Sequence, residues 1–266
     1  MAYNGDGTSG YLTVAQAVAT GYPLTMFCWF NWPSATTNTL VSISTDTSNS
    51  HYFLLLLTAS GGALNAVARA NDGSSKDATS STTAATNTWH SAAAVFSSAT
   101  DRRVYLNGGN VGTNTTSATP SGVNRTSILK AVTLGATSFG VGQVAEAAIW
   151  NAALSAEEIA ILSKGFSPLC LWWRLPNLVL HQDLIRPLNR PGFGPAMTAV
   201  GTTTVVAHPR VILPARPSWW RIRRVEYFDP YRLSAAAAHA CPVERGWAAS
   251  TGAERGTTYS IGEVSS

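Results

Sequence analysis

The stretch "NTWHSAAAVFSSATDRRVYLNGG", residues 87–109, decides the fold class of this chain. It contains two runs of small apolar and β-branched residues, 90–96 and 103–106, separated by a polar turn. Runs of this length bounded by turn residues are typical of β-strands. The second run ends at Asn107-Gly108, a pair that readily adopts the positive φ angles of a tight hairpin turn. We therefore predict two consecutive antiparallel strands followed by a hairpin.

Similar short segments occur on both sides of this stretch. They are apolar or alternating, and Gly, Asn, Asp, Ser and Thr separate them. They are "SGYLTV" (9–14), "PLTMFCWFNW" (23–32), "NTLVSIS" (38–44), "HYFLLLLTA" (51–59), "GALNAVARA" (62–70), "ILKAVTLGA" (128–136) and "GQVAEAAIW" (142–150). Many short strands at regular spacing predict an all-β sandwich or jelly roll.

One segment departs from the β pattern. In "ALSAEEIAILSKG" (153–165), Ser155 is placed as an N-cap, with Glu158 as its capping-box partner three residues later. Gly165 provides a natural stop. The sequence thus predicts a single short helix that closes the β region.

Composition limits the other possibilities. The chain has 266 residues, of which 45% are hydrophobic and only 12% charged, enough for one large core or two modest ones. Its three cysteines, Cys28, Cys170 and Cys241, are too few for a disulfide framework or a four-cysteine zinc site, so we expect buried thiols. The start of the chain shows no signal-peptide pattern, and "YFLLLL" is far shorter than the roughly 20 residues of a membrane span.

The composition changes after Gly165. Residues 1–165 carry seven Lys and Arg against eight Asp and Glu, whereas residues 166–266 carry eleven Arg, six acids and ten of the thirteen prolines. We therefore divide the chain into a domain at 1–165 and an extension at 166–266. In the extension, "NLVLHQDLI" (177–185) is expected to return as a strand, and a Pro- and Arg-rich arm is expected to follow along a surface, because proline removes backbone donors.

The order of these motifs resembles the laminin-G-like, concanavalin A-like jelly-roll superfamily. The resemblance rests on "YNGDGTSGYLTV" (3–14), "LTMFCWFNW" (24–32), "NTWHSAAAVF" (87–96), "RVYLNGG" (103–109) and "GQVAEAAIWNAALSAEEIAIL" (142–162). It implies a jelly roll with one short helix over residues 3–165, and an extended C-terminal arm beyond it. In this resemblance Trp89 and His90 begin a central strand, where His90 either packs structurally or contacts a ligand.

Catalysis is not expected. Glycoside hydrolysis requires two carboxyl groups. The resemblance implies that a hydrolase of this superfamily would carry both on one face of one strand. The corresponding strand here holds Glu146 alone, and we expect Glu146 to accept structural hydrogen bonds. None of the five histidines lies near a nucleophile motif.

The sequence offers two candidate ligand sites, one for calcium and one for carbohydrate. No cofactor other than calcium is expected. The segment "ANDGSSKDA" (70–78) offers oxygen ligands for calcium from Asn71, Asp72 and Asp77, although Asn-Asp-Gly is equally the vocabulary of a solvated turn. Candidate carbohydrate contacts are Trp32, Tyr105 and His90, but strand alternation places most such aromatics in the core.

The segment "PSWWRIRRVEYFDPYR" (217–232) interleaves arginine with aromatic residues. That pattern suits single-stranded nucleic acid, a membrane surface or a protein interface. Glu226 and Asp229 interrupt the basic run, so a protein interface is favoured over nucleic acid. The predicted assembly residues are Trp219, Trp220, Arg221, Arg223, Arg224, Tyr227 and Phe228.

A jelly roll with such an arm resembles the laminin-G-like proteins of tailed-bacteriophage particles. The resemblance implies a non-enzymatic virion protein, made in the host cytoplasm, that decorates a capsid or forms part of a fibre or tail. Its partners would be other virion proteins and copies of itself. The alternative is a lectin-like module that binds surface glycans, with calcium as an optional partner.

Overall fold

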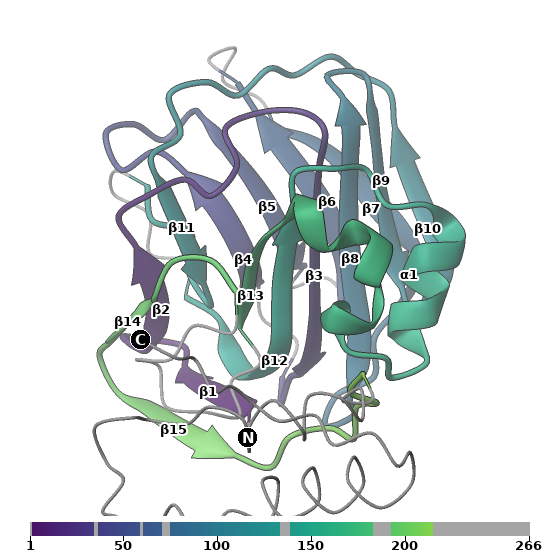
Figure 1. Ribbon diagram of the computed structural model, residues 1–266. Coiled ribbons are helices and arrows are strands. Elements are labelled where there is room, and N and C mark those ends of the chain that lie inside the picture. The colour runs from purple at the N-terminus through teal and green to yellow at the C-terminus, as the bar shows by residue number, and fades with distance from the viewer. Residues whose placement is uncertain are drawn as a thin grey trace, which may run out of the picture. The chain divides into compact units, whose positions relative to one another are not determined.

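The computed structural model is an antiparallel β-sandwich (Figure 1). It describes residues 2–34, 37–58, 61–70, 75–133, 139–182 and 193–214. The first compact unit of the chain is Met1–Pro214, so this unit continues well past Gly165. The all-β jelly-roll class with one short helix is confirmed.

Among the described residues, eight strands form the first sheet, in the order β10-β9-β8-β3-β12-β1-β15, with β13 also pairing with β12. Their bounds are β1 (Ala2–Asp6), β3 (Leu24–Asn31), β8 (His90–Ser98), β9 (Asp101–Leu106), β10 (Gly109–Asn114), β12 (Val141–Trp150), β13 (Leu178–Gln182) and β15 (Thr203–Val206). We call this the eight-stranded sheet.

The opposing sheet has seven strands in the described part of the chain, in the order β14-β2-β11-β4-β5-β6-β7. Their bounds are β2 (Tyr11–Val14), β4 (Asn38–Ser44), β5 (Tyr52–Leu57), β6 (Ala63–Arg69), β7 (Ser75–Thr83), β11 (Arg125–Ile128) and β14 (Thr198–Val200). We call this the seven-stranded sheet.

The hairpin that decided the fold forms as predicted. Strands β8 and β9 pair antiparallel, and the β9–β10 turn has positive φ angles at Asn107 (55°) and Gly108 (75°). The Asn107 side chain also accepts a hydrogen bond from the Ser91 backbone. The turn therefore fixes the register of the hairpin and joins it to β8.

Two parts of the chain differ from the sequence-based expectation. The segment from Ser75 to Thr83, expected to begin as a loop, is the edge strand β7. Its Ser- and Thr-rich composition conceals it, because only one apolar side chain, Ala78, points into the core. After Gly165, three described strands pair with the sandwich. Strand β13 joins β12 as expected, and the short strands β14 and β15 pair with β2 and β1.

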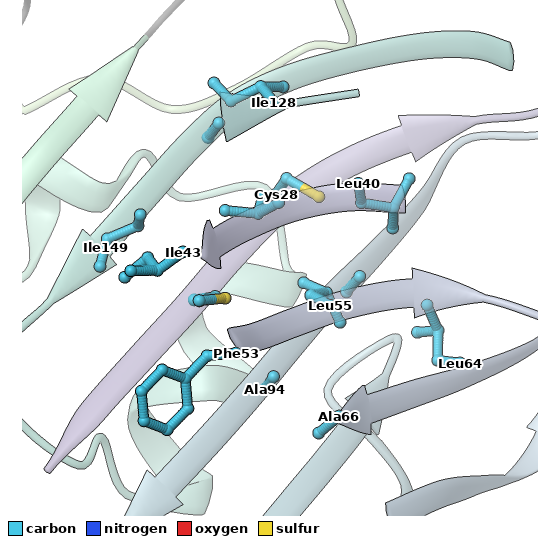
Figure 2. Packing of buried hydrophobic residues seen from close by; sticks show 14 of the residues in the cluster. Cys28, Leu40, Ile43, Phe53, Leu55, Leu64, Ala66, Ala94, Ile128 and Ile149 are labelled. Carbon is cyan, nitrogen blue, oxygen red and sulfur yellow. The ribbon is translucent and has the colours of Figure 1, made fainter. Parts of the chain in front are cut away.

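The main core lies between the two sheets (Figure 2). Side chains from the eight-stranded sheet, such as Cys28 and Ile149, interdigitate with Ile43, Phe53 and Leu55 from the seven-stranded sheet. Cys28 is buried as expected, whereas Cys170 is only half-buried. At roughly 25 cal/mol per Å² of buried apolar surface, this core is the dominant stabilising element of the domain.

A second core lies on the outer face of the eight-stranded sheet. A short helix covers this face (Figure 1). The predicted helix forms as α1 (Ala156–Ser163) with its complete capping box, and its Ile159 and Leu162 pack against Phe27, Tyr105 and Trp150. Two 3-10 helices follow, η1 (Pro168–Cys170) and η2 (Trp172–Asn177). No helix in the described residues is long and apolar enough to cross a membrane. Within those residues, the outer face of the seven-stranded sheet carries no helix.

Candidate functional site: the outer face of the seven-stranded sheet

The three predicted sugar contacts do not form one site. Trp32 and His90 are both buried, and both donate to the Ala85 carbonyl oxygen, over 3.1 Å from Trp32 Nε1 and 3.1 Å from His90 Nε2. His90 Nδ1 lies 3.0 Å from Asn107 Nδ2, so both ring nitrogens are used within the domain. Tyr105 is buried in the second core, on the other side of its sheet. These side chains make their contacts within the domain and hold its strands and loops together.

A regular patch of side chains occupies the outer face of β5, β6 and β7. Its members alternate with core residues of the same strands, so they point away from the sandwich. The register places Tyr52 opposite Arg69, Leu54 opposite Val67, and Leu56 opposite Asn65. On the other side of β6, Arg69, Val67 and Asn65 face Ser75, Asp77 and Thr79. We call these nine residues the outer patch.

The centre of the outer patch is apolar and its corners are polar. Leu54 and Val67 form a small buried cluster with Ala131, which lies in the segment after β11. That segment is held across the sheet by Ser42 and Ser44, whose hydroxyls donate to the carbonyl oxygens of Lys130 and Val132. The described segment after β11 therefore covers part of this face.

An aromatic side chain and a cation stand at one corner of the outer patch. Arg69 Nη1 donates to the Tyr52 hydroxyl over 3.4 Å, and the guanidinium carbon lies 5.8 Å from the centre of the Tyr52 ring. This contact is within the range of a cation–π interaction. It holds the half-buried Tyr52 ring in one orientation on the surface.

A second aromatic group lies over β2 and β11 on the same face. Lys130 Nζ lies 4.5 Å from the Tyr11 ring centre and 4.3 Å from that of Phe139. Partial burial lowers the pKa of Lys130 from its ordinary value. The outer face of the seven-stranded sheet thus carries aromatic rings and cations at both ends.

Two oxygens of the outer patch are buried without a donor. Within the described part of the chain, neither Asn65 Oδ1 nor Asp77 Oδ1 receives a hydrogen bond. Asn65 as a whole is only 7% exposed. Buried polar atoms are normally paired, and each exception calls for a physical explanation.

The predicted calcium ligands are only partly visible. Asn71 and Asp72 lie outside the described residues, and Asp77 stands on strand β7 and not in a loop. Among the described residues, no group of three or more His, Cys, Asp or Glu side chains is arranged to hold a metal ion. The residues described at Asp77 do not fit calcium, because one carboxylate beside the Arg69 cation falls short of the six to eight oxygens that calcium takes.

Glu146 is the centre of a separate buried polar cluster. It lies at an irregularity in β12 with φ 49°, and it is 0% exposed. Its Oε2 accepts from Ser167 Oγ over 2.8 Å and from His181 Nε2 over 3.1 Å, and His208 Nε2 lies 3.4 Å from Oε1. Burial alone raises the pKa of Glu146, but the hydrogen bonds and charge of the imidazoles outweigh burial and lower it to about 2.

This cluster is structural. The Ser167 hydroxyl donates to the carboxylate and not to a histidine, so the three groups do not form the arrangement of a nucleophile with its general base. Glu146 instead ties the segments around Ser167, His181 and His208 to β12. The sequence identified Glu146 as an acceptor but not its partners, which come from the region after Gly165.

The predicted assembly residues, Trp219 to Phe228, lie outside the described residues. Several large apolar side chains near the end of the described chain are nevertheless exposed. Trp172 is 72% exposed, and Ile212 and Leu213 are each about half exposed. Ile212 is bonded through its backbone to Gly165 and Ser167, next to η1.

Comparison with known proteins agrees with this architecture. The profile of the Concanavalin A-like lectin/glucanases superfamily matches residues 6–160, and the chain belongs to this family. A search of curated protein sequences finds no match.

Solved structures show the same fold at low sequence identity. A heptameric SAP-like pentraxin from Limulus polyphemus aligns with a TM-score of 0.54 and 16% identity, over 76% of this chain and 93% of its own. A putative carbohydrate binding protein from Bacteroides ovatus aligns with a TM-score of 0.53 and 15% identity, over 79% of this chain and 61% of its own. Domain 4 of AbnA, an arabinanase of Geobacillus stearothermophilus solved with arabinotriose, aligns with a TM-score of 0.51 and 18% identity, over 61% and 76%.

Proposed function

We propose that this protein is a non-catalytic, lectin-like module that binds carbohydrate on the outer face of its seven-stranded sheet. The observation that carries the proposal is the outer patch, where the half-buried Tyr52 ring is held by Arg69 beside the polar groups of β6 and β7. Sugar rings combine apolar faces with hydroxyl groups, so a surface that recognises them needs both kinds of contact. The outer patch supplies both within nine residues.

Its place on the sandwich supports the proposal. The outer face of the eight-stranded sheet is covered by α1, η1 and η2, so its aromatic residues are buried in the second core. The seven-stranded sheet keeps Tyr52, Leu56 and Arg69 half-buried, and Ser75 and Thr79 exposed. Among the described residues, no helix covers this face.

The carboxylates support a non-catalytic role. Glycoside hydrolysis requires two carboxyl groups flanking the scissile bond. On β12 the carboxylate of Glu146 is fully buried and bonded to Ser167 and His181.

A glycan array probed with the full-length protein tests the proposal. We expect binding to specific oligosaccharides, and we expect Tyr52→Ala to weaken it about 10-fold, since loss of a stacked ring costs about 1.4 kcal/mol. Trp172→Ala is the matched control, because it removes an exposed aromatic ring from a different part of the domain. A wild-type protein that binds no oligosaccharide, or equal losses in the two variants, would contradict the proposal.

A structural role in a virion is the second candidate, and one observation favours it. Trp172 in η2, and Ile212 and Leu213 near the last described residue, expose apolar surface, and such surface is typical of protein interfaces. If the protein assembles through this surface, light scattering should detect a defined oligomer that Trp172→Asp converts to a smaller species. An unchanged mass for the variant would exclude Trp172 from the interface.

A further inference from the structure

One side of the sandwich is closed where its two sheets end. The edge strands there are β7 and β10, and Asn114 Nδ2 of β10 donates to the Asp77 carbonyl oxygen of β7 over 2.9 Å. A Cβ atom on Gly112 of β10 would overlap the Thr79 carbonyl oxygen, so the two backbones are in direct contact. Strand β7 also carries the charged residues Lys76 and Asp77. Each of these edge strands is therefore covered by the other.

The opposite ends of the two sheets are the strands β14 and β15. Strand β15 pairs with β1 along one edge, and among the described residues no strand pairs with its other edge (Figure 1). Thr204 is exposed, and Val205 is 56% exposed. An unpaired edge presents backbone N–H and C=O groups to which another strand can bind.

The edge at β15 lacks the features that usually prevent such pairing. Natural proteins protect their sheet edges with charged residues, proline or a β-bulge. The segment "MTAVGTTTVVA" (197–207) contains no charged residue and no proline, and four consecutive residue pairs join β15 to β1 without a bulge. This segment also lies beyond residues 6–160, which the family profile matches, so the edge is a feature of the chain's own C-terminal part.

The side chains of the edge favour a second copy of the same strand as the partner. Two β15 strands that pair antiparallel about a two-fold axis place only Thr and Val side chains opposite one another. Pairs of β-branched side chains stabilise neighbouring strands, whereas like charges directly opposite destabilise them. A partner strand with charged side chains would bring them beside Val205, which offers no counter-charge.

We propose that β15 is a dimerisation edge, through which two copies of this protein pair antiparallel and join their eight-stranded sheets into one continuous sheet. The outer patch lies on the other sheet, so the proposal does not depend on carbohydrate binding. A dimer carries two outer patches, and two linked sites bind a multivalent surface more tightly than one site does.

The small size of the edge sets the expected affinity. Strand β15 has four residues, so pairing along it buries less than the roughly 1,200 Å² of a stable interface, and contacts of this size are typical of transient complexes. Sedimentation equilibrium of the full-length protein from about 1 to 200 μM tests for such a weak dimer. We expect the mass to rise with concentration from one chain toward two.

Three variants locate the contact. Val205→Lys adds the charge that protected edges carry, and we expect it to weaken the dimer roughly 10-fold or more. Val205→Thr keeps an uncharged β-branched side chain and should retain the dimer. Val111→Lys is the matched control, because Val111 is 42% exposed on β10, the edge strand at the opposite end of the same sheet. Equal melting temperatures for these variants would show that each is folded.

The outcomes separate β15 from other surfaces. A wild type that remains a single chain at the highest concentration, or whose mass passes that of two chains, would overturn the proposal. So would an equal effect of Val205→Lys and Val111→Lys. An oligomer that Trp172→Asp dissociates but Val205→Lys does not would place the interface at Trp172. In each of these cases a positive glycan array would leave the proposed function standing.

Discussion

Replacing Glu146 with glutamine should destabilise the protein at neutral pH by an amount that can be worked out from its surroundings. The carboxylate is fully buried, and Ser167 Oγ and His181 Nε2 donate to it over 2.8 and 3.1 Å. These contacts hold its pKa at about 2, against an ordinary value of 4.5. At 1.36 kcal/mol per pKa unit, the ionised form stabilises the fold by about 3 kcal/mol.

The pH dependence gives the prediction its sign. Because the folded pKa lies below the unfolded one, this stabilisation is complete above pH 4.5 and disappears as the pH falls toward 2. Glu146→Gln has no such proton to take up. The difference between the wild type and the variant should therefore be about 3 kcal/mol at pH 7 and should shrink between pH 4.5 and 2.

Urea unfolding at a series of pH values measures this difference. For a domain of this size, about 3 kcal/mol corresponds to a melting temperature lower by roughly 6–12 °C at pH 7. Glu157→Gln is the matched control, because Glu157 is exposed in the first turn of α1 and its change should cost less than about 1 kcal/mol. An effect of Glu146→Gln that is absent at pH 7, or equal at pH 7 and pH 3, would refute the reasoning.

Three further substitutions test other parts of the fold. Ser155→Ala removes the side chain that caps α1 and should cost about 1 kcal/mol in urea unfolding, and Ser155→Asp should recover most of that loss. Arg102→Met removes the buried guanidinium that donates to the carbonyl oxygens of Lys76, Ala99 and Thr116, and a cost of about 1–3 kcal/mol should appear as a lower urea midpoint; an unchanged midpoint would show that these bonds add no net stability. Asn107→Ala places at φ 55° a residue that tolerates this angle less well than asparagine, and it breaks the contact with His90, so calorimetry should show a loss of about 1–3 kcal/mol, whereas Asn107→Gly should lose less because glycine tolerates that angle.

The outer patch shows why a binding face is harder to predict than a core. Alternation in "HYFLLLLTA" and "GALNAVARA" separates inward from outward side chains, so Phe53 and Leu55 are identifiable as core residues. The same alternation cannot show which outer face a helix will cover. Strand β7 has few apolar residues, so the sequence predicts a loop at Asp77 and does not indicate that Val67 lies opposite it or that Asn65 lies diagonal to it.

The sequence by itself determined the all-β class, the Asn107-Gly108 hairpin and the capped helix at Ser155, because local backbone geometry and nearby residues specify each of them. Only the tertiary structure decided the outer patch and the polar cluster around Glu146. The outer patch depends on the register of three strands, and Glu146 finds its partners 21 and 35 residues away, at Ser167 and His181. Contacts between distant segments arise from packing the two sheets, and no local pattern along the chain encodes which segments will meet.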